Sequence, residues 1–199
     1  MKVITLPLGY LQTNCYIAID EETKRCAVID PGDKPDRIAE VLRENGLTPE
    51  LVLLTHGHFD HVGATRAMQE LYHIPIYISE ADTHDEEMTH GRLIYTDTCA
   101  EGDELRVGSL TFRVLSTPGH SKGSVCYLAG DTLFSGDTLF CGSMGRTDFP
   151  GGSIFEMMVS LRRLVALPGN YRVLPGHGEE TTLDEERLHN PYLREAVRG

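Results

Sequence analysis

The chain has 199 residues, of which 40% are hydrophobic and 24% charged, and its formal net charge is -12. A chain of this length can bury enough apolar surface to fold without disulfides or metals as staples. The acidic balance argues against nucleic-acid binding, which needs clustered Lys and Arg, and no apolar run approaches the ~20 residues that span a bilayer.

The first half of the chain alternates short apolar runs with helical patterns. In chain order it predicts strands at residues 2–8, 14–20, 26–32, 50–55 and 74–79, and helices at 35–45, 62–73 and 80–89. The first helix is bounded by Pro35, which suits a first turn, and by Gly46, which suits a helix end. The run 50–55 is continuously apolar, as is typical of a strand covered on both faces.

The second half has a similar mixture. It predicts two strands within 103–119 that meet at Gly108 and Ser109, further strands at 124–130, 132–137 and 171–178, and helices at 154–167 and 182–190. Strands and helices mix through both halves, and no linker or low-complexity segment divides them. We therefore expect one α/β (α+β) domain over residues 1–199, built from two sheets with helices outside.

The cysteines and the start of the chain indicate the compartment. Five cysteines are scattered without a CxxC pair: Cys15, Cys26, Cys99, Cys126 and Cys141. This pattern predicts small buried apolar residues rather than disulfides or a thiolate zinc site. The start, MKVITLPLG, alternates as a strand does and does not resemble a signal peptide, so we expect a cytoplasmic protein.

The stretch LLTHGHFDHVG crowds imidazoles and a carboxylate at the end of a predicted buried strand. It contains His56, His58, Asp60 and His61. Neutral histidines gain little from one another and charged ones repel, so the crowding makes sense if a cation lies among them. Histidine is the commonest metal ligand, and carboxylates accompany it at zinc.

Three later stretches share one design, a short apolar strand followed by a turn and a metal-type ligand. They are FRVLSTPGH, TLFSGD and RVLPGH, which end in His120, Asp137 and His177. Strand ends position side chains well, and glycine lets the backbone turn close to an ion. If the strands lie side by side, these loops converge with the first cluster.

The spacing favours two ions rather than one. His56 and His58 project the same way from an extended segment, whereas Asp60 and His61 begin the next helix. We expect one ion at His56, His58 and His120 and another at Asp60, His61 and His177. Asp137 could bridge them with its two oxygens. Nitrogen and oxygen ligands make zinc the first choice of divalent ion, with iron and manganese open.

The segments THGHFDH, TPGHSKGSV, FSGDTLF and LPGHGEET, in this order, resemble the metallo-β-lactamase superfamily. The resemblance covers nearly the whole chain. It implies a four-layer αββα sandwich, the metallo-β-lactamase fold, with a metal site at the sandwich edge. It also implies that Asp30, in the segment IDPG, supports the metal loop without binding the ions itself.

Within the superfamily, Asp137 stands where classical zinc β-lactamases use a cysteine in an equivalent role, which argues against a β-lactamase. GSMGRTDFPGGS and HNPYLRE are similar to the short branch of the glyoxalase II (hydroxyacylglutathione hydrolase) family. This resemblance implies a thioester hydrolase acting on the small molecule S-D-lactoylglutathione or a related acyl-thiol. Longer glyoxalase II enzymes hold glutathione with a basic C-terminal helical extension. This chain ends at Gly199 without one, which leaves the thiol carrier open.

The expected mechanism is hydrolysis by water that two cations make reactive at neutral pH. Asp60 and Asp137 would hold ions and water in place rather than act as nucleophiles. Lys122 and Arg146, the basic residues nearest the ligand stretches, are candidates for an anionic substrate. The alternative for Lys122 is a solvated charge in a loop. The alternative for Arg146 is an ion pair with Asp148 that braces the loop. Tyr10, apolar in a predicted turn, is a candidate pocket residue whose alternative is ordinary packing.

Other functions remain open on sequence alone. One is another hydrolase of the same superfamily, acting on a lactone or a phosphoester. The segment GRTDF also resembles persulfide dioxygenases, in which His56, His120 and Asp137 would hold one iron, since two histidines and a carboxylate suit oxygen chemistry. A metal-stabilised binding module without turnover is the remaining alternative. The sequence leaves the oligomeric state undetermined.

Overall fold

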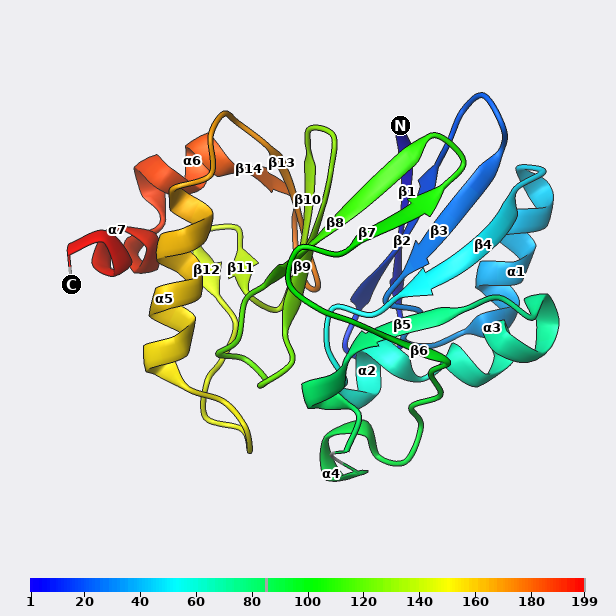
Figure 1. The fold of residues 1–199 in the computed structure, drawn as a ribbon, viewed down its shortest axis with the longest axis horizontal. Helices are drawn as coiled ribbons and strands as arrows, with labels where there is room; N and C mark the ends of the chain where they lie inside the picture. Colours follow the sequence, from blue (N-terminus) through cyan, green and yellow to red (C-terminus); the bar gives the residue numbers. More distant parts are fainter. Residues whose placement is uncertain (85, 199) are drawn as a thin grey trace.

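The structure is a computed structural model that describes residues 1–84 and 86–198. Two six-stranded sheets face each other at its centre, and helices cover the outer side of each sheet (Figure 1). The layers therefore run helix, sheet, sheet, helix. The αββα sandwich expected from the sequence is confirmed.

The first sheet comes from the first half of the chain. Its strands lie in sequence order: β1 (Lys2–Leu8), β2 (Thr13–Ile19), β3 (Arg25–Ile29), β4 (Thr48–Leu53), β5 (Ile76–Ser79) and β6 (Asp97–Cys99). The pairs β1–β2 and β2–β3 are antiparallel, and β3 to β6 run parallel. The parallel strands bring the loops after β3 and β4 to one edge.

The second sheet comes from the second half. In spatial order it contains β14 (Thr181–Thr182), β13 (Arg172–Pro175), β10 (Thr132–Gly136), β9 (Val125–Ala129), β8 (Leu110–Ser116) and β7 (Glu104–Val107). The strands β10 and β13 are parallel, so their C-terminal ends lie together. A small separate ribbon pairs β11 (Leu139–Phe140) with β12 (Ser143–Met144).

The helices divide between the two outer layers. The first sheet is flanked by α1 (Pro35–Glu44), α2 (Phe59–Val62) and α3 (Thr65–Tyr72), with η1 (Glu80–Asp82) and α4 (Glu86–Thr89) below them (Figure 1). The second sheet is covered by α5 (Ile154–Val165), α6 (Leu183–His189) and α7 (Pro191–Arg198). No helix among the described residues is long and apolar enough to cross a membrane.

The core forms three layers because strand side chains alternate between faces. In β2, Cys15 and Ile17 pack into the cluster beneath α1 and α3, whereas Tyr16 and Ala18 pack between the two sheets. A third cluster fills the space between the second sheet and α5 to α7 and includes Leu161. Burial on both faces explains why β2 and β4 read as apolar runs.

Several elements differ from the sequence prediction. The single helix expected at 62–73 is two helices, α2 and α3. They meet at Gly63, where an added Cβ would lie 2.2 Å from the carbonyl oxygen of Gly32. The helix expected at 80–89 consists of η1 and α4, and Asp85 lies outside the described residues. The sequence reading missed α7 and the short strands β6, β11, β12 and β14, whose two or three residues carry too little pattern.

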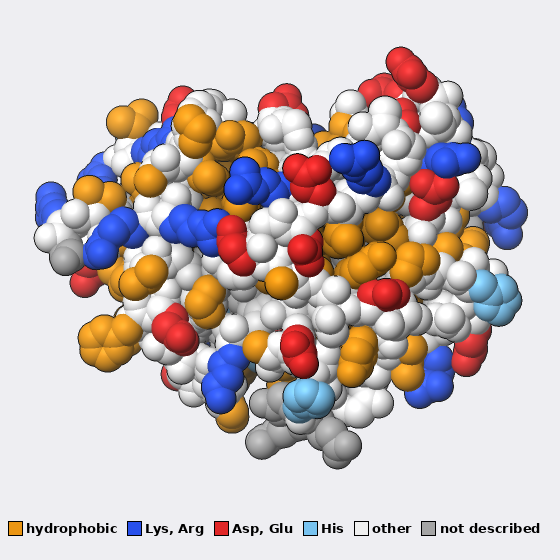
Figure 2. All heavy atoms as spheres, in the orientation of Figure 1, with side chains coloured by type: hydrophobic (Ala, Val, Ile, Leu, Met, Phe, Trp, Pro, Cys, Tyr) orange, Lys and Arg blue, Asp and Glu red, His pale blue; other side chains and the backbone are white. Residues whose placement is uncertain are grey.

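Surface and cysteines fit the composition. On the face drawn in Figure 2, acidic and basic side chains are interspersed rather than gathered by sign. Four cysteines are buried and Cys141 is exposed. Burial raises the pKa of the Cys126 thiol to about 11, so that side chain is a neutral core residue.

Candidate metal centre

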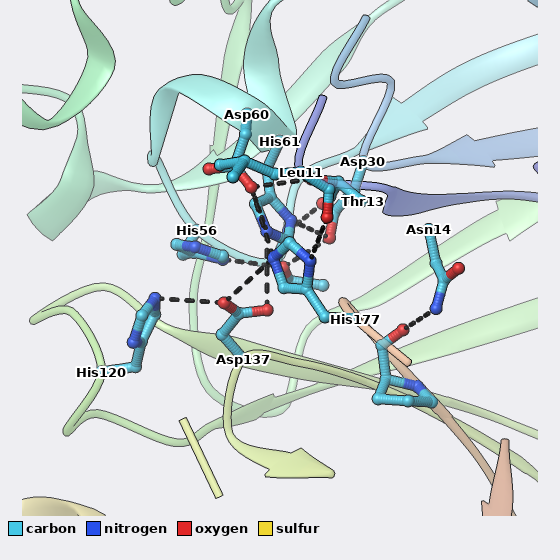
Figure 3. A network of polar contacts seen from close by, with 12 residues as sticks. Leu11, Thr13, Asn14, Asp30, His56, Asp60, His61, His120, Asp137 and His177 are labelled. Carbon is cyan, nitrogen blue, oxygen red and sulfur yellow. Dashed lines mark hydrogen bonds and ion pairs between the residues drawn. The ribbon is translucent and has the colours of Figure 1, made fainter. Parts of the chain in front are cut away.

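Seven side chains from four separate segments meet at the edge of the sandwich. Three groups have ligand atoms within 4.8 Å of one another: His56, His58 and His120; His56, His61 and Asp137; and Asp60, His61 and His177. Figure 3 shows the imidazoles of His56, His61, His120 and His177 gathered around Asp137. The structure thus brings together all seven residues proposed as ligands from the sequence.

The first loop is positioned by the strand that precedes it. Leu53 and Leu54 are fully buried, and the chain then turns outward at Thr55. The carboxylate of Asp30, at the end of β3, accepts hydrogen bonds from the backbone N and the Oγ1 of Thr55, at 2.8 and 2.6 Å. Asp30 adopts a positive φ of 49° to do so. A neighbouring strand end therefore holds the start of the histidine loop.

Asp137 lies between the two predicted metal positions. Its Oδ2 is 3.4 Å from Nε2 of His120 and 3.6 Å from Nε2 of His177, and its Oδ1 is 3.5 Å from Nε2 of His61. His120 belongs to the first predicted ligand set, and His61 and His177 belong to the second. The carboxylate is thus placed where a bridging ligand would lie.

Four of the rings are turned so that Nδ1 is occupied and Nε2 faces the centre. Nδ1 of His56 lies 3.0 Å from Thr55 Oγ1, and that of His61 lies 2.9 Å from Asp30 Oδ2. Nδ1 of His120 and of His177 contact the carbonyl oxygens of Arg146 and Leu11, at 2.8 and 3.3 Å. A metal-ligating histidine typically donates its other nitrogen to a carboxylate or carbonyl in this way.

Four of the buried atoms that face the centre lack a hydrogen-bond partner. Among the described residues, the buried side-chain atoms without a hydrogen bond are Nε2 of His56, His61 and His120 and Oδ1 of Asp137. Burying polar atoms unpaired costs about 1–3 kcal/mol each. Their clustering at one point means that the fold keeps them for a ligand, and nitrogen and oxygen donors of this kind fit divalent cations.

The electrostatics of the two positions differ. Burial and the neighbouring His120 hold the pKa of His58 at about 4, and burial and His61 hold the pKa of His56 well below its usual range. Both rings are therefore neutral at pH 7, as a ligand must be. Burial opposes the charge of His61, but Asp137, Asp30 and Asp60 together raise its pKa to about 9. A bound cation would take the place of the proton that charges the His61 ring.

Residues of strand β2 hold the second predicted metal position, that of Asp60, His61 and His177. The sequence analysis did not predict this role. Thr13 Oγ1 donates to Asp60 Oδ2 at 2.7 Å. The Asn14 side chain donates to the carbonyl oxygens of Pro175 and Gly178, both at 3.0 Å, and so clamps the loop that carries His177. In the sequence these residues read as the start of an ordinary strand, and no spacing links them to the ligands.

Asp82 holds the first predicted metal position, that of His56, His58 and His120. The sequence analysis did not predict this role either. It is 1% exposed and lies in η1. Its Oδ2 accepts from the backbone N of Gly57 at 3.0 Å and from Ser121 Oγ at 2.7 Å, and its Oδ1 accepts from the backbone N of Gly123 at 2.6 Å. It therefore ties the loop of His56 and His58 to the loop of His120. Burial raises its pKa. One aspartate in a polar segment carries no sequence signal for this role.

The three candidate substrate residues surround the centre. The Arg146 guanidinium pairs with both oxygens of Asp148 at 2.7 Å, and its Cζ lies 3.7 Å from the centroid of the Phe149 ring. Lys122 is exposed and lines a cleft of about 410 Å³ with Ser121, beside His120. Tyr10 is 98% exposed at the β1–β2 turn.

Comparisons with known proteins agree with this geometry. The family profile described as "Metallo-beta-lactamase superfamily" matches residues 8–177. The chain is 32% identical to "Hydroxyacylglutathione hydrolase GloC" of Haemophilus influenzae, over 97% of this chain and 98% of that protein. It is similar to the crystal structure of BLEG-1 B3 metallo-beta-lactamase, with a TM-score of 0.88 and 37% identity over 96% of this chain and 99% of that one. It is also similar to TTHA1623 in a di-iron-bound form, with a TM-score of 0.85 and 38% identity over 95% and 99%.

Proposed function

The chain belongs to the metallo-beta-lactamase superfamily, and we propose that within it this protein is a thioester hydrolase of the glyoxalase II type that uses two divalent metal ions. The observation that carries the proposal is the set of inward-facing, unpartnered atoms of His56, His61, His120 and Asp137. The likeness to a hydroxyacylglutathione hydrolase supports a thioester substrate. Zinc is the first choice of metal, with iron and manganese as alternatives. The protein would act in the cytoplasm as one domain spanning residues 1–199.

In this proposal one ion is held by His56, His58 and His120 and the other by Asp60, His61 and His177, with Asp137 between them. When bound, the ions would supply Lewis acidity that makes water a nucleophile at neutral pH and polarises the substrate carbonyl. No protein side chain is needed as a nucleophile.

The protein's own contribution is to fix orientation. Asp60 is held by Thr13, and Asp137 lies within 3.6 Å of the Nε2 atoms of His61, His120 and His177. Both carboxylates are thereby positioned for ions and water. His120 and Asp137 are almost fully buried, which strengthens the electrostatic interactions at the reacting carbonyl.

The thiol carrier would meet the cationic side of the centre. Arg146 presents its backbone carbonyl to His120, and its side chain is held over Phe149. The pairing with Asp148 holds the guanidinium in place. It also uses the Nε and Nη2 donors of Arg146, which are then not free for a substrate. Lys122 has no such partner among the described residues and lies in the cleft beside His120. We therefore assign Lys122 the first role in holding an anionic carrier, with Arg146 second.

The test measures metal content per chain and three activities side by side. These are S-D-lactoylglutathione hydrolysis, persulfide-dependent oxygen uptake and cleavage of a chromogenic cephalosporin. We expect two metal ions per chain and thioester turnover. One iron with oxygen uptake, or cephalosporin cleavage in the absence of thioester turnover, would replace the proposal.

A further inference from the structure

A second cleft opens beside Asp60, one of the predicted ligands. Its volume is about 300 Å³, and the apolar side chains that line it are Leu8, Tyr10, Leu11 and Phe59. Three charged residues, Asp33, Asp60 and Arg92, also line it. The cleft lies between the β1–β2 turn and the start of α2.

The cleft is continuous with the metal centre. Asp60 and Thr13, which line it, share a hydrogen bond of 2.7 Å, and Asp60 Oδ2 lies 3.3 Å from Nε2 of His177. The carbonyl oxygen of Leu11 accepts from Nδ1 of His177. Figure 3 shows the contacts of Thr13 with Asp60 and of Leu11 with His177. A substrate whose carbonyl lies at the centre would reach the cleft within a few bonds.

The turn exposes apolar groups that would be better buried. Tyr10 is 98% exposed and Leu11 47% exposed, at a position where ordinary packing would cover them. Gly9 has a positive φ of 69°, and a Cβ there would lie 2.8 Å from the carboxylate of Asp33. Tyr10 and Leu11 therefore line the cleft while staying exposed, instead of packing into the core.

The two clefts differ in chemistry, and this orients a thioester. Lys122, Ser121 and His84 line the first cleft, which suits a polar, anionic carrier. The second cleft offers aliphatic and aromatic contact. Low-molecular-weight thiol carriers are polar, so the apolar portion of an acyl-thiol is its acyl chain. We propose that the Tyr10–Leu11–Phe59 cleft is an acyl subsite, so that the enzyme prefers thioesters with apolar acyl chains of several carbons over acetyl and lactoyl. This inference rests on the proposed thioesterase function.

The test uses thioesters of one carrier, N-acetylcysteamine, with acetyl, butanoyl and hexanoyl groups. Each methylene that enters an apolar cleft improves transfer from water by a factor of roughly two to four. We therefore expect kcat/KM to rise at least about tenfold from acetyl to hexanoyl. In Leu11→Ala and in Tyr10→Ala the rise becomes smaller. Phe155→Ala is the matched control, because Phe155 is 83% exposed on α5, in the other outer layer, and the full rise persists there.

A binding measurement gives a readout that does not depend on turnover. The chain contains no tryptophan, so Tyr10→Trp introduces a single fluorophore at the cleft. We expect its emission to shift to shorter wavelength in a saturable titration with hexanoate, and not with acetate at the same concentrations.

The outcomes separate this inference from the proposed function. Hydrolysis that is flat with chain length, or a rise that Leu11→Ala and Tyr10→Ala leave unchanged, overturns the acyl subsite and keeps the thioesterase. Absence of turnover on every thioester overturns the proposed function. In that case a saturable hexanoate shift still supports an apolar subsite, and its absence overturns that as well.

Discussion

The carboxylate of Asp30 lies 2.9 Å from Nδ1 of His61, and both groups are almost fully buried. The same carboxylate holds the backbone N and the hydroxyl of Thr55, whose hydroxyl lies 3.0 Å from His56 Nδ1. One residue at the end of β3 thus sets the orientation of a histidine in each predicted metal position. Because Asp30 is far from the ligands in the chain, this link exists only in the folded protein.

Replacing Asp30 tests that link. In Asp30→Ala, the His61 ring loses its partner, and we expect metal affinity to fall by about 10–100-fold, as for other outer contacts to ligating histidines. A metal titration monitored by calorimetry measures the affinity. Asp20→Ala is the control, because Asp20 is a 3% exposed carboxylate that holds the backbone N of Ser109, in the β7–β8 turn. Equal loss of metal in both variants would mean that Asp30 acts only through stability.

Asp82 tests the second brace. An amide cannot accept all three hydrogen bonds that Gly57, Ser121 and Gly123 donate, so Asp82→Asn should loosen the loops of His56, His58 and His120. We expect one of the two metal ions to bind at least about tenfold more weakly. A Co²⁺ titration followed by its visible absorption resolves the two binding steps. If both steps weaken equally, Asp82 does not act on one position in particular.

His58 tests the ligand assignment directly. In His58→Ala, we expect the metal content to fall from two ions towards one and most thioesterase activity to disappear, while circular dichroism stays unchanged. Elemental analysis and the hydrolysis assay measure this. His189→Ala serves as the control, since the His189 side chain is 70% exposed on α6, where it pairs with Glu185 at 3.7 Å. A His58→Ala protein that keeps both ions and its turnover would refute the assignment.

Metal removal should destabilise the protein. The unpartnered atoms of His56, His61, His120 and Asp137 gain their partners only from bound ions in the proposed site. At a free metal concentration of 100 times Kd, binding adds about 2.7 kcal/mol to the free energy of unfolding. For a chain of this length that corresponds to a rise in Tm of about 5–10 °C. Scanning calorimetry with chelator and with added zinc measures it, and identical melting curves would argue against a metal site here.

The ion pair between Glu101 and Arg163 predicts a pH dependence of stability. Hydrogen bonds from Arg163 and from the backbone N of Ser116 lower the pKa of Glu101. Because the folded pKa lies below the unfolded value of about 4.3, the pair stabilises the protein above that value. The contribution is lost as pH falls through the folded pKa. The pair is partly exposed, so we expect only about 0.5–1 kcal/mol at pH 7.

Glu101→Gln measures this contribution. In urea unfolding of the metal-free protein, we expect the variant to be less stable than the parent at pH 7, and we expect this difference to be smaller at pH 3. Glu104→Gln, on an exposed pair with Arg106 at 3.6 Å, should change little at either pH. A difference between Glu101→Gln and the parent that is as large at pH 3 as at pH 7 would show that the carboxylate charge is not its cause.

Most strands and the seven candidate ligands could be predicted because short stretches of sequence are enough to indicate them. Two-residue alternation and continuous apolar runs identify β1 to β5, β7 to β10 and β13, and the spacing of His56, His58, Asp60 and His61 is compact enough to indicate a metal. The short strands and α7 could not be found in this way, because strands of two or three residues have no period and α7 has only eight residues, of which Leu193 and Ala196 are buried.

What the sequence by itself determined is therefore which side chains are chemically suited to hold metal and which faces of the strands are apolar. Tertiary structure alone decided that Asp82, Thr13 and Asn14 brace the loops that carry the ligands, and that clefts of different polarity lie beside the centre. It also set the distances at which Asp137 and Asp30 take the places that the sequence had indicated. The physical reason is that these relationships join residues far apart in the chain, such as Asn14, whose side chain donates to the Gly178 carbonyl 164 positions away. Only the packing of one sheet on the other brings such atoms within hydrogen-bonding distance.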